Sequence, residues 1–231
     1  MFSCVLCCGP RIRGAIVTIA AALSAACHPS PRPTAIPGGA LSGRFVTAPH
    51  GMVVSASSIA SEAGRDVLAA GGNAVDAAIA TGFALAVTYP AAGNVGGGGF
   101  MVVRFPDGRA TTFDFRERAP SAATPDMFTD STGAYSAHIH HDSYRSVGVP
   151  GTVAGFALAH RRYGDTQWAR LVDPAVRLAR DGFLVPIGLA QSLESARPQF
   201  SPYAASVTAY TRNGAPYTAG EHYCSPISRG H

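Results

Sequence analysis

The stretch that decides the fold is residues 71–88, which read GGNAVDAAIATGFALAVT. Asn73 can cap a helix through its side-chain oxygen, and Asp76 lies in the first turn, where the helix dipole favours a negative charge. Residues 77–87 are apolar on nearly every side, which is typical of a helix in a protein interior. We therefore expect a buried helix that begins after Asn73 and ends before Pro90.

A second helix is expected immediately upstream, in the run SEAGRDVLAAGG at 61–72. Gly71 and Gly72 would end this helix, because glycine adopts the left-handed conformation at low steric cost. Further upstream, residues 28–43 are rich in proline, glycine and serine and lack apolar periodicity, as linkers do. The folded domain is therefore expected to begin near Phe45.

The first residues have the pattern of an export signal. Two arginines precede an uncharged, apolar run at 14–26 that ends in small residues, which is the order of a secretory signal peptide. This run of 13 residues is too short to span a bilayer comfortably. We expect a signal peptide at 1–26, a linker at 27–44 and a periplasmic or secreted protein with no stable membrane span. A lipid anchor on Cys27 is the alternative.

Downstream of the buried helix, the sequence predicts a β-hairpin. Residues 100–105, FMVVRF, are β-branched and aromatic, which favours a strand. Proline presets the first turn dihedral and glycine accepts the positive one, so Pro106-Asp107-Gly108 is expected to form the turn. Residues 109–117 would then return antiparallel to the first strand.

Arg116 is the candidate binding residue on this hairpin. Side chains alternate between the two faces of a strand, which puts Arg116 on a polar face with Phe113 and Phe115 behind it. A guanidinium at a strand end can bind a carboxylate through two parallel hydrogen bonds. The alternative from the residues alone is an ion pair with Asp114 or Glu117, since surface arginines often pair in this way.

Further helices are expected beyond the hairpin. Residues 152–163 form one that Gly164 stops, and 174–180 form another, with Asp173 as cap and proline at the first helical position. The order of helices and strands indicates an α+β or layered α/β body. Residues 221–231 show neither a period nor a cap and are expected to be poorly ordered.

Composition narrows the partners and cofactors. Of the 231 residues, 47% are hydrophobic and 14% charged, and all 18 basic residues are arginine. These arginines are scattered, so the sequence has no stripe of the kind that binds nucleic acid. His138, His140 and His141 lie among polar residues and are interpreted as a solvated loop without a metal. The glycines at 96–99 lack the context of a phosphate-binding loop and indicate crowded backbone. No cofactor is expected.

Several longer segments together resemble the γ-glutamyltransferase family, also called γ-glutamyltranspeptidase or glutathione hydrolase. The resemblance covers about residues 45–223 and is carried by motifs in the family's order. These motifs are GMVVS at 51–55, GGNAVDAA at 71–78, PAAGNVGGGGFM at 90–101, DFRERAP at 114–120, VPGTVAGF at 149–156 and PAVRLARDGF at 174–183.

The resemblance implies a fold and a mechanism. Family members are N-terminal nucleophile hydrolases with a layered αββα sandwich, made as a zymogen that cleaves itself before a threonine. That threonine attacks the γ-glutamyl amide of glutathione, and the glutamyl group passes to water or an amino acid. Arg116 matches the family arginine in F-R-E, which grips the α-carboxylate of the glutamyl group. The implied partners are γ-glutamyl compounds and the small subunit of the same precursor.

The sequence departs from the family in one respect that affects activity. The family's threonine lies in a T-T-H motif well downstream, whereas Thr111-Thr112-Phe113 lies in an upstream strand. We therefore expect residues 45–223 to be a partial large-subunit domain, an incomplete sandwich that is inactive alone. Residues 224–231 depart from the family and are interpreted as a frameshifted or truncated tail.

Three other functions compete with this interpretation. One is a non-catalytic exported module that binds γ-glutamyl ligands, and another is a relative of the cephalosporin acylases on the same scaffold. The third is a nucleotide-binding domain built on the glycine run, which the sequence favours least.

Overall fold

The central helix pair of the expected fold is present in the computed structural model, which describes residues 46–93 and 95–224. Helix α2 spans Ser58–Ala69, and the side chain of Ser57 caps it by accepting a hydrogen bond from the backbone of Ala60. Gly71 follows with a φ of 93°, the left-handed conformation expected of a glycine at a helix end. The helix thus begins three residues before the predicted run, because Ser57 provides the cap.

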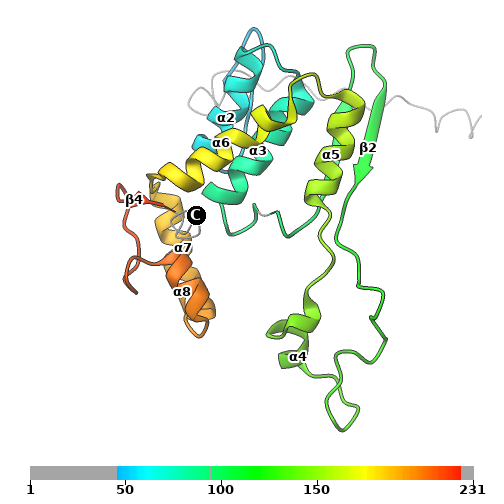
Figure 1. Ribbon diagram of the computed structural model, residues 1–231, viewed down its shortest axis with the longest axis vertical. Helices are drawn as coiled ribbons and strands as arrows, with labels where there is room; N and C mark the ends of the chain where they lie inside the picture. The colour runs from blue at the N-terminus through cyan, green and yellow to red at the C-terminus, as the bar shows by residue number, and fades with distance from the viewer. Residues whose placement is uncertain (1–45, 94, 225–231) are drawn as a thin grey trace, which may run out of the picture. The chain divides into compact units, whose positions relative to one another are not determined.

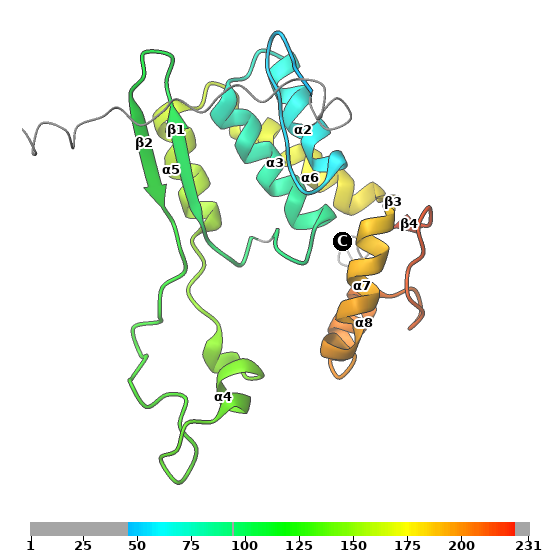
Figure 2. The same cartoon turned by 180° about the vertical axis from the view of Figure 1, so that it is seen from behind.

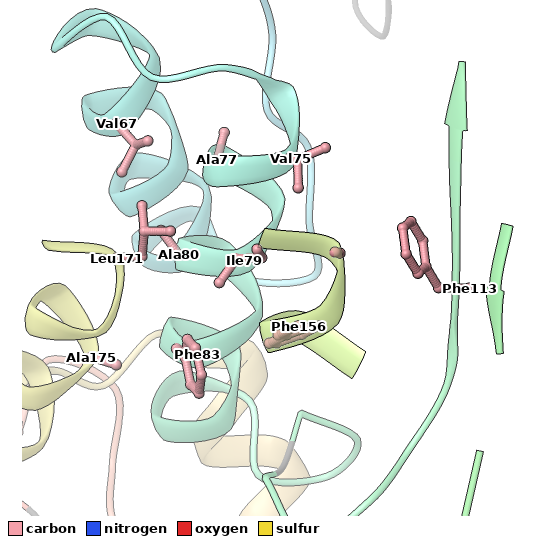
Figure 3. Packing of buried hydrophobic residues seen from close by; sticks show 11 residues of the cluster. Val67, Val75, Ala77, Ile79, Ala80, Phe83, Phe113, Phe156, Leu171 and Ala175 are labelled. Carbon is pink, nitrogen blue, oxygen red and sulfur yellow. The ribbon is translucent and has the colours of Figure 1, made fainter. Parts of the chain in front are cut away.

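Helix α3, Ala74–Thr88, is the buried helix that the sequence predicts. Asn73 and Asp76 form a capping box. The Asn73 side chain accepts a hydrogen bond from the backbone N–H of Asp76, and the Asp76 carboxylate accepts one from the backbone N–H of Asn73. Helix α3 packs against α2, α5 and α6 (Figure 1). It supplies five of the eleven buried residues of the main hydrophobic cluster, more than any other element (Figure 3).

Asp76 links α3 to the loop that follows α5. Its side chain is fully buried, and its carboxylate accepts hydrogen bonds from the backbone N–H groups of Asp165 and Thr166 and from the Thr166 hydroxyl. The side-chain nitrogen of Asn73 donates to the carbonyl of Tyr163, 2.6 Å away. One helix cap therefore also holds a segment about ninety residues further along the chain.

The hairpin has the predicted turn and the predicted aromatic inner face, whereas its outer face also carries exposed Phe100 and Val102. Strands β1, Phe100–Arg104, and β2, Ala110–Asp114, lie side by side (Figure 2). They pair antiparallel, with Val102 opposite Thr112. Gly108 in the turn has a φ of 87°. Phe113 is buried and meets the ring of Tyr163 edge-on, with 6.0 Å between ring centres. This contact seats the inner face of the hairpin on α5.

Helix α5, Thr152–Tyr163, has the predicted bounds, whereas the prediction for the next helix is wrong at its start. Helix α6 spans Trp168–Asp181 and contains Pro174 in its interior. An interior proline costs about 3 kcal/mol. That cost is offset by Leu171, whose full burial contributes about 1.5–3 kcal/mol, and by partly buried Trp168, which packs edge-on against Phe83.

Between the hairpin and α5, residues 119–148 form a long loop, called the excursion below, whose two ends are joined. Arg118 and Val149 form an antiparallel bridge at its base. The excursion contains the short helices α4, Ala137–His141, and η1, Tyr144–Ser146. The three histidines are thus on a short helix that Ser136 caps, rather than on the predicted loop. No described group of histidine, cysteine, aspartate and glutamate side chains has the arrangement of a metal site.

The C-terminal elements form a second cluster. They are β3, Phe183–Leu184, α7, Ile187–Phe200, α8, Ala204–Tyr210, and β4, His222–Tyr223. Strand β4 pairs with β3, and Tyr217 and Tyr223 are buried beside Phe183. The predicted disorder is therefore wrong for residues 221–224. Their order comes from the packing of Tyr223 on residues distant in sequence, which a search for local periodicity does not detect.

The described elements have mixed α and β content, and none of their helices is both long and apolar enough to cross a membrane. The predicted signal peptide, the linker and the possible lipid site at Cys27 lie outside the described residues. The same holds for residues 225–231 of the predicted aberrant tail.

Candidate anion-binding site

Arg116 lies two residues beyond β2, where the hairpin still has backbone pairing. The N–H of Phe115 donates to the carbonyl of Gly99 at 3.0 Å, and the N–H of Gly99 returns a hydrogen bond at 3.4 Å. The ring of Phe115 meets that of Phe156 on α5, with 5.7 Å between ring centres. The residue before Arg116 is therefore fixed both by backbone hydrogen bonds and by side-chain packing.

Glycines hold the backbone of this strand from the other side. A Cβ atom on Gly98 would lie 2.6 Å from the carbonyl oxygen of Phe115 and 2.8 Å from the Cα of Arg116. Gly151 and Gly155 approach Phe115 just as closely. The N–H groups of Gly151 and Thr152 both donate to the carbonyl of Gly97, at 2.9 and 3.0 Å. The glycines thus permit close backbone contact, as the sequence indicates.

The guanidinium of Arg116 is exposed and has no ion-pair partner among the described residues. It lies over the ring of Phe100, 5.9 Å from the ring centre, a distance at which cation–π attraction holds an arginine in place. Asp114, the expected alternative partner, instead accepts a hydrogen bond from the backbone N–H of Arg116 at 3.1 Å. The guanidinium keeps its donors free for an anion.

A cavity of about 480 Å³ lies along the base of the excursion, and Glu117, the residue after Arg116, is part of its wall. Its charged lining residues are Glu117, Arg118 and Arg145, and its apolar ones include Met127 and Phe128. Sequence reasoning did not find Arg145, because 27 residues separate it from Arg118 and only the closure of the excursion brings both to one cavity. No local motif marks it.

This arrangement can bind and orient an anionic ligand. Guanidinium groups bind carboxylates through charge-assisted, often bidentate hydrogen bonds. Thr111 and Thr112, the two consecutive threonines in this region, both lie inside β2 with their backbone nitrogens in peptide bonds. Neither has the free α-amine that activates a threonine at a chain start. These two threonines are therefore not candidates for an N-terminal nucleophile.

Comparison with known proteins gives consistent matches over this region. The family model described as Gamma-glutamyltranspeptidase matches residues 60–227. The chain is 47% identical over 177 residues to a glutathione hydrolase proenzyme of Pseudomonas sp. (strain A14), covering 76% of this chain and 31% of that protein. The chain therefore spans about a third of the length of this curated relative.

Solved structures match the fold as well. The γ-glutamyltranspeptidase of Helicobacter pylori aligns with a TM-score of 0.75 at 40% identity, over 80% of this chain and 53% of that one. The cephalosporin acylase from Bacillus halodurans aligns with a TM-score of 0.68 at 27% identity, over 86% of this chain and 37% of that one.

Proposed function

The chain belongs to the γ-glutamyltranspeptidase family, and on that premise we propose that it forms the donor-binding part of a glutathione hydrolase. In this proposal Arg116 grips the α-carboxylate of a γ-glutamyl donor such as glutathione. The observation that carries the proposal is the exposed guanidinium of Arg116, held over Phe100 and free of ion pairs with the described residues. Charge-assisted hydrogen bonds would fix the donor's orientation.

The reaction itself requires a nucleophile. In the family mechanism, a threonine freed by self-cleavage attacks the γ-glutamyl amide, the amine of the leaving peptide departs, and water or an amino acid then takes the glutamyl group. The threonine's own α-amine serves as the base. Because Thr111 and Thr112 are embedded in β2, we expect residues 1–231 to bind the donor without hydrolysing it. The small subunit would supply the nucleophile.

The proposed fold is the part of a layered αββα sandwich that precedes the small subunit. The exposed side of the hairpin supports this, since Phe100 and Val102 on that side are 65% and 72% exposed. Large apolar side chains on the open face of a two-stranded sheet are typical of a surface that another layer covers. We also propose export through residues 1–26, which cell fractionation of the expressed protein would test.

The proposed role of Arg116 is tested by calorimetric titration of the 231-residue chain with glutathione. We expect Arg116→Gln to weaken binding at least about tenfold, because charge-assisted hydrogen bonds contribute about 1.5–3 kcal/mol each. Arg161→Gln, which removes an exposed arginine on α5, is the matched control and should leave binding unchanged. Equal affinities for the parent chain and Arg116→Gln would refute the assignment.

A second candidate is an acylase of the cephalosporin type, which the likeness to the Bacillus halodurans structure favours. The two candidates differ in the α-amino group of the donor, which a γ-glutamyl donor carries and a glutaryl donor lacks, while both present a carboxylate to Arg116. Titration with a glutaryl amide, which keeps this carboxylate and lacks only the α-amino group, separates them. Tighter binding of the glutaryl compound than of glutathione would favour the acylase.

A further inference from the structure

The cavity at the base of the excursion has a lining that the proposed binding of the donor by Arg116 does not use. It measures about 480 Å³, within the range of small-ligand sites. Arg118 and Arg145 bring two positive charges to it and Glu117 one negative charge, and its other lining residues are uncharged. The lining therefore has a net charge of +1 and favours an anionic group.

Both arginines of the cavity are held in place by the backbone around them. The N–H of Arg118 donates to the carbonyl of Val149 at 3.2 Å, and the N–H of Val149 donates back at 2.8 Å. Nη1 of Arg145 donates to the carbonyl of Met127 at 3.2 Å, across the mouth of the excursion. Within the described part of the chain, neither guanidinium forms an ion pair. Most of their donors remain available.

The remaining lining fits the end of a peptide. Met127, Phe128 and Val147 give apolar contact, and Phe128 is itself fixed by stacking on His140, with 4.4 Å between ring centres. The Glu117 carboxylate can accept a hydrogen bond from a peptide N–H, while the two arginines bind a carboxylate. A carboxylate that follows a peptide N–H is the C-terminus of a peptide.

The position of the cavity relative to Arg116 sets its role. Glu117, on the cavity wall, is the residue next to Arg116. Consecutive Cα atoms are about 3.8 Å apart and an extended tripeptide spans about 10 Å, so a donor bound at Arg116 is long enough to extend past Glu117.

From these observations we infer that Arg118 and Arg145 bind the C-terminal carboxylate of the peptide attached to the γ-glutamyl group. The inference rests on the proposed function and adds a preference to it. Donors whose leaving group ends in a free carboxylate, as glutathione does, are bound better than those whose leaving group is neutral.

The test compares glutathione with its glycyl ethyl ester, in which a neutral ester replaces the terminal carboxylate, by calorimetric titration of the full 231-residue chain. We expect glutathione to bind about tenfold more tightly than the ester. Arg145→Gln should reduce this ratio to below about threefold, and Arg145→Lys should restore part of it, since lysine retains the charge. Arg161→Gln is the matched control and keeps the full ratio.

The outcomes separate this inference from the proposed function. Arg116→Gln is expected to weaken both ligands by the same factor and to keep their ratio. Equal binding of glutathione and its ester to the parent chain overturns the role of Arg118 and Arg145 while leaving Arg116 in place. Failure of both ligands to bind a chain whose circular dichroism shows a cooperative melt overturns the inference and the proposed function together.

Discussion

The guanidinium of Arg116 lies just beyond the end of β2. One face of the hairpin packs on α5 there, and the other face is exposed to solvent. Phe115 faces α5 while Arg116 faces outward over Phe100. The alternation of faces, and with it the outward direction of Arg116, follows from the sequence because it depends only on the period of a strand. The lack of an ion pair with Asp114 does not follow from the sequence. Asp114 accepts a hydrogen bond from the backbone N–H of Arg116 instead, which depends on the path of the chain after β2.

Asp76 has two structural roles, and the sequence predicts only the first of them. The pattern after Asn73 predicts a helix cap, and the structure adds hydrogen bonds to Asp165 and Thr166 that no local pattern signals. A fully buried carboxylate is costly unless hydrogen bonds satisfy it. These donors come from a loop that folds onto the cap, so the pairing could not be predicted from either segment alone.

The first stability prediction concerns this carboxylate. Asp76→Ala leaves the backbone donors at residues 73, 165 and 166 without their acceptor. We expect the free energy of unfolding to fall by about 3–5 kcal/mol, because each buried unsatisfied donor costs about 1–3 kcal/mol. Urea denaturation followed by circular dichroism measures the change.

The control for Asp76 is Asp66→Ala on α2. Asp66 pairs with Arg65 on the surface, where both side chains are about two-thirds exposed. Exposed pairs of this kind contribute less than about 1 kcal/mol. A loss at Asp76 no larger than the loss at Asp66 would show that the buried network does not hold the two segments together.

At the scale of elements, the sequence predicts what local chemistry determines. The cap of α3, the bounds of α5 and the turn of the hairpin all depend on residues within a few positions of each other. The start of α6 and the pairing of β4 depend on burial against distant segments. Proline is tolerated inside α6 because its neighbours bury Trp168 and Leu171 on α3, which no window of the sequence contains.

The pairing of β3 with β4 gives a pH prediction. Burial raises the pKa of the Tyr223 phenol to about 12, with smaller contributions from Tyr210 and Tyr217. The ordinary value in an unfolded chain is about 10. The folded state therefore favours the neutral phenol, and its stabilising effect is complete below pH 10 and is lost as the pH rises from about 10 to about 12.

We expect the free energy of unfolding to decrease by up to about 2 kcal/mol across this window because of Tyr223. Tyr223→Phe removes the titrating group, so its stability should depend less steeply on pH. Denaturation at pH 9, 10 and 11 compares the two slopes. Parallel slopes for the parent and Tyr223→Phe would show that the phenol is not buried in the folded chain.

At the scale of the whole molecule, the chain presents the proposed donor-binding surface and a hairpin with an apolar outer face. Phe100 and Val102 on that face are more than half exposed. The matched proenzyme of Pseudomonas is about three times as long as the part it shares with this chain. In our account the remaining part of such a protein covers this face and brings the threonine to the γ-glutamyl amide that Arg116 positions.

The most direct test of this account is a chimera in which residues 45–223 replace the matched segment of the Pseudomonas proenzyme. We expect the chimera to cleave itself and to hydrolyse glutathione. Introducing Arg116→Gln should leave self-cleavage intact and lower kcat/KM for glutathione about 100-fold, which corresponds to the loss of about 3 kcal/mol from a bidentate, charge-assisted pair. A self-cleaved Arg116→Gln chimera as active as its parent would contradict the assignment of Arg116 as the donor's carboxylate grip.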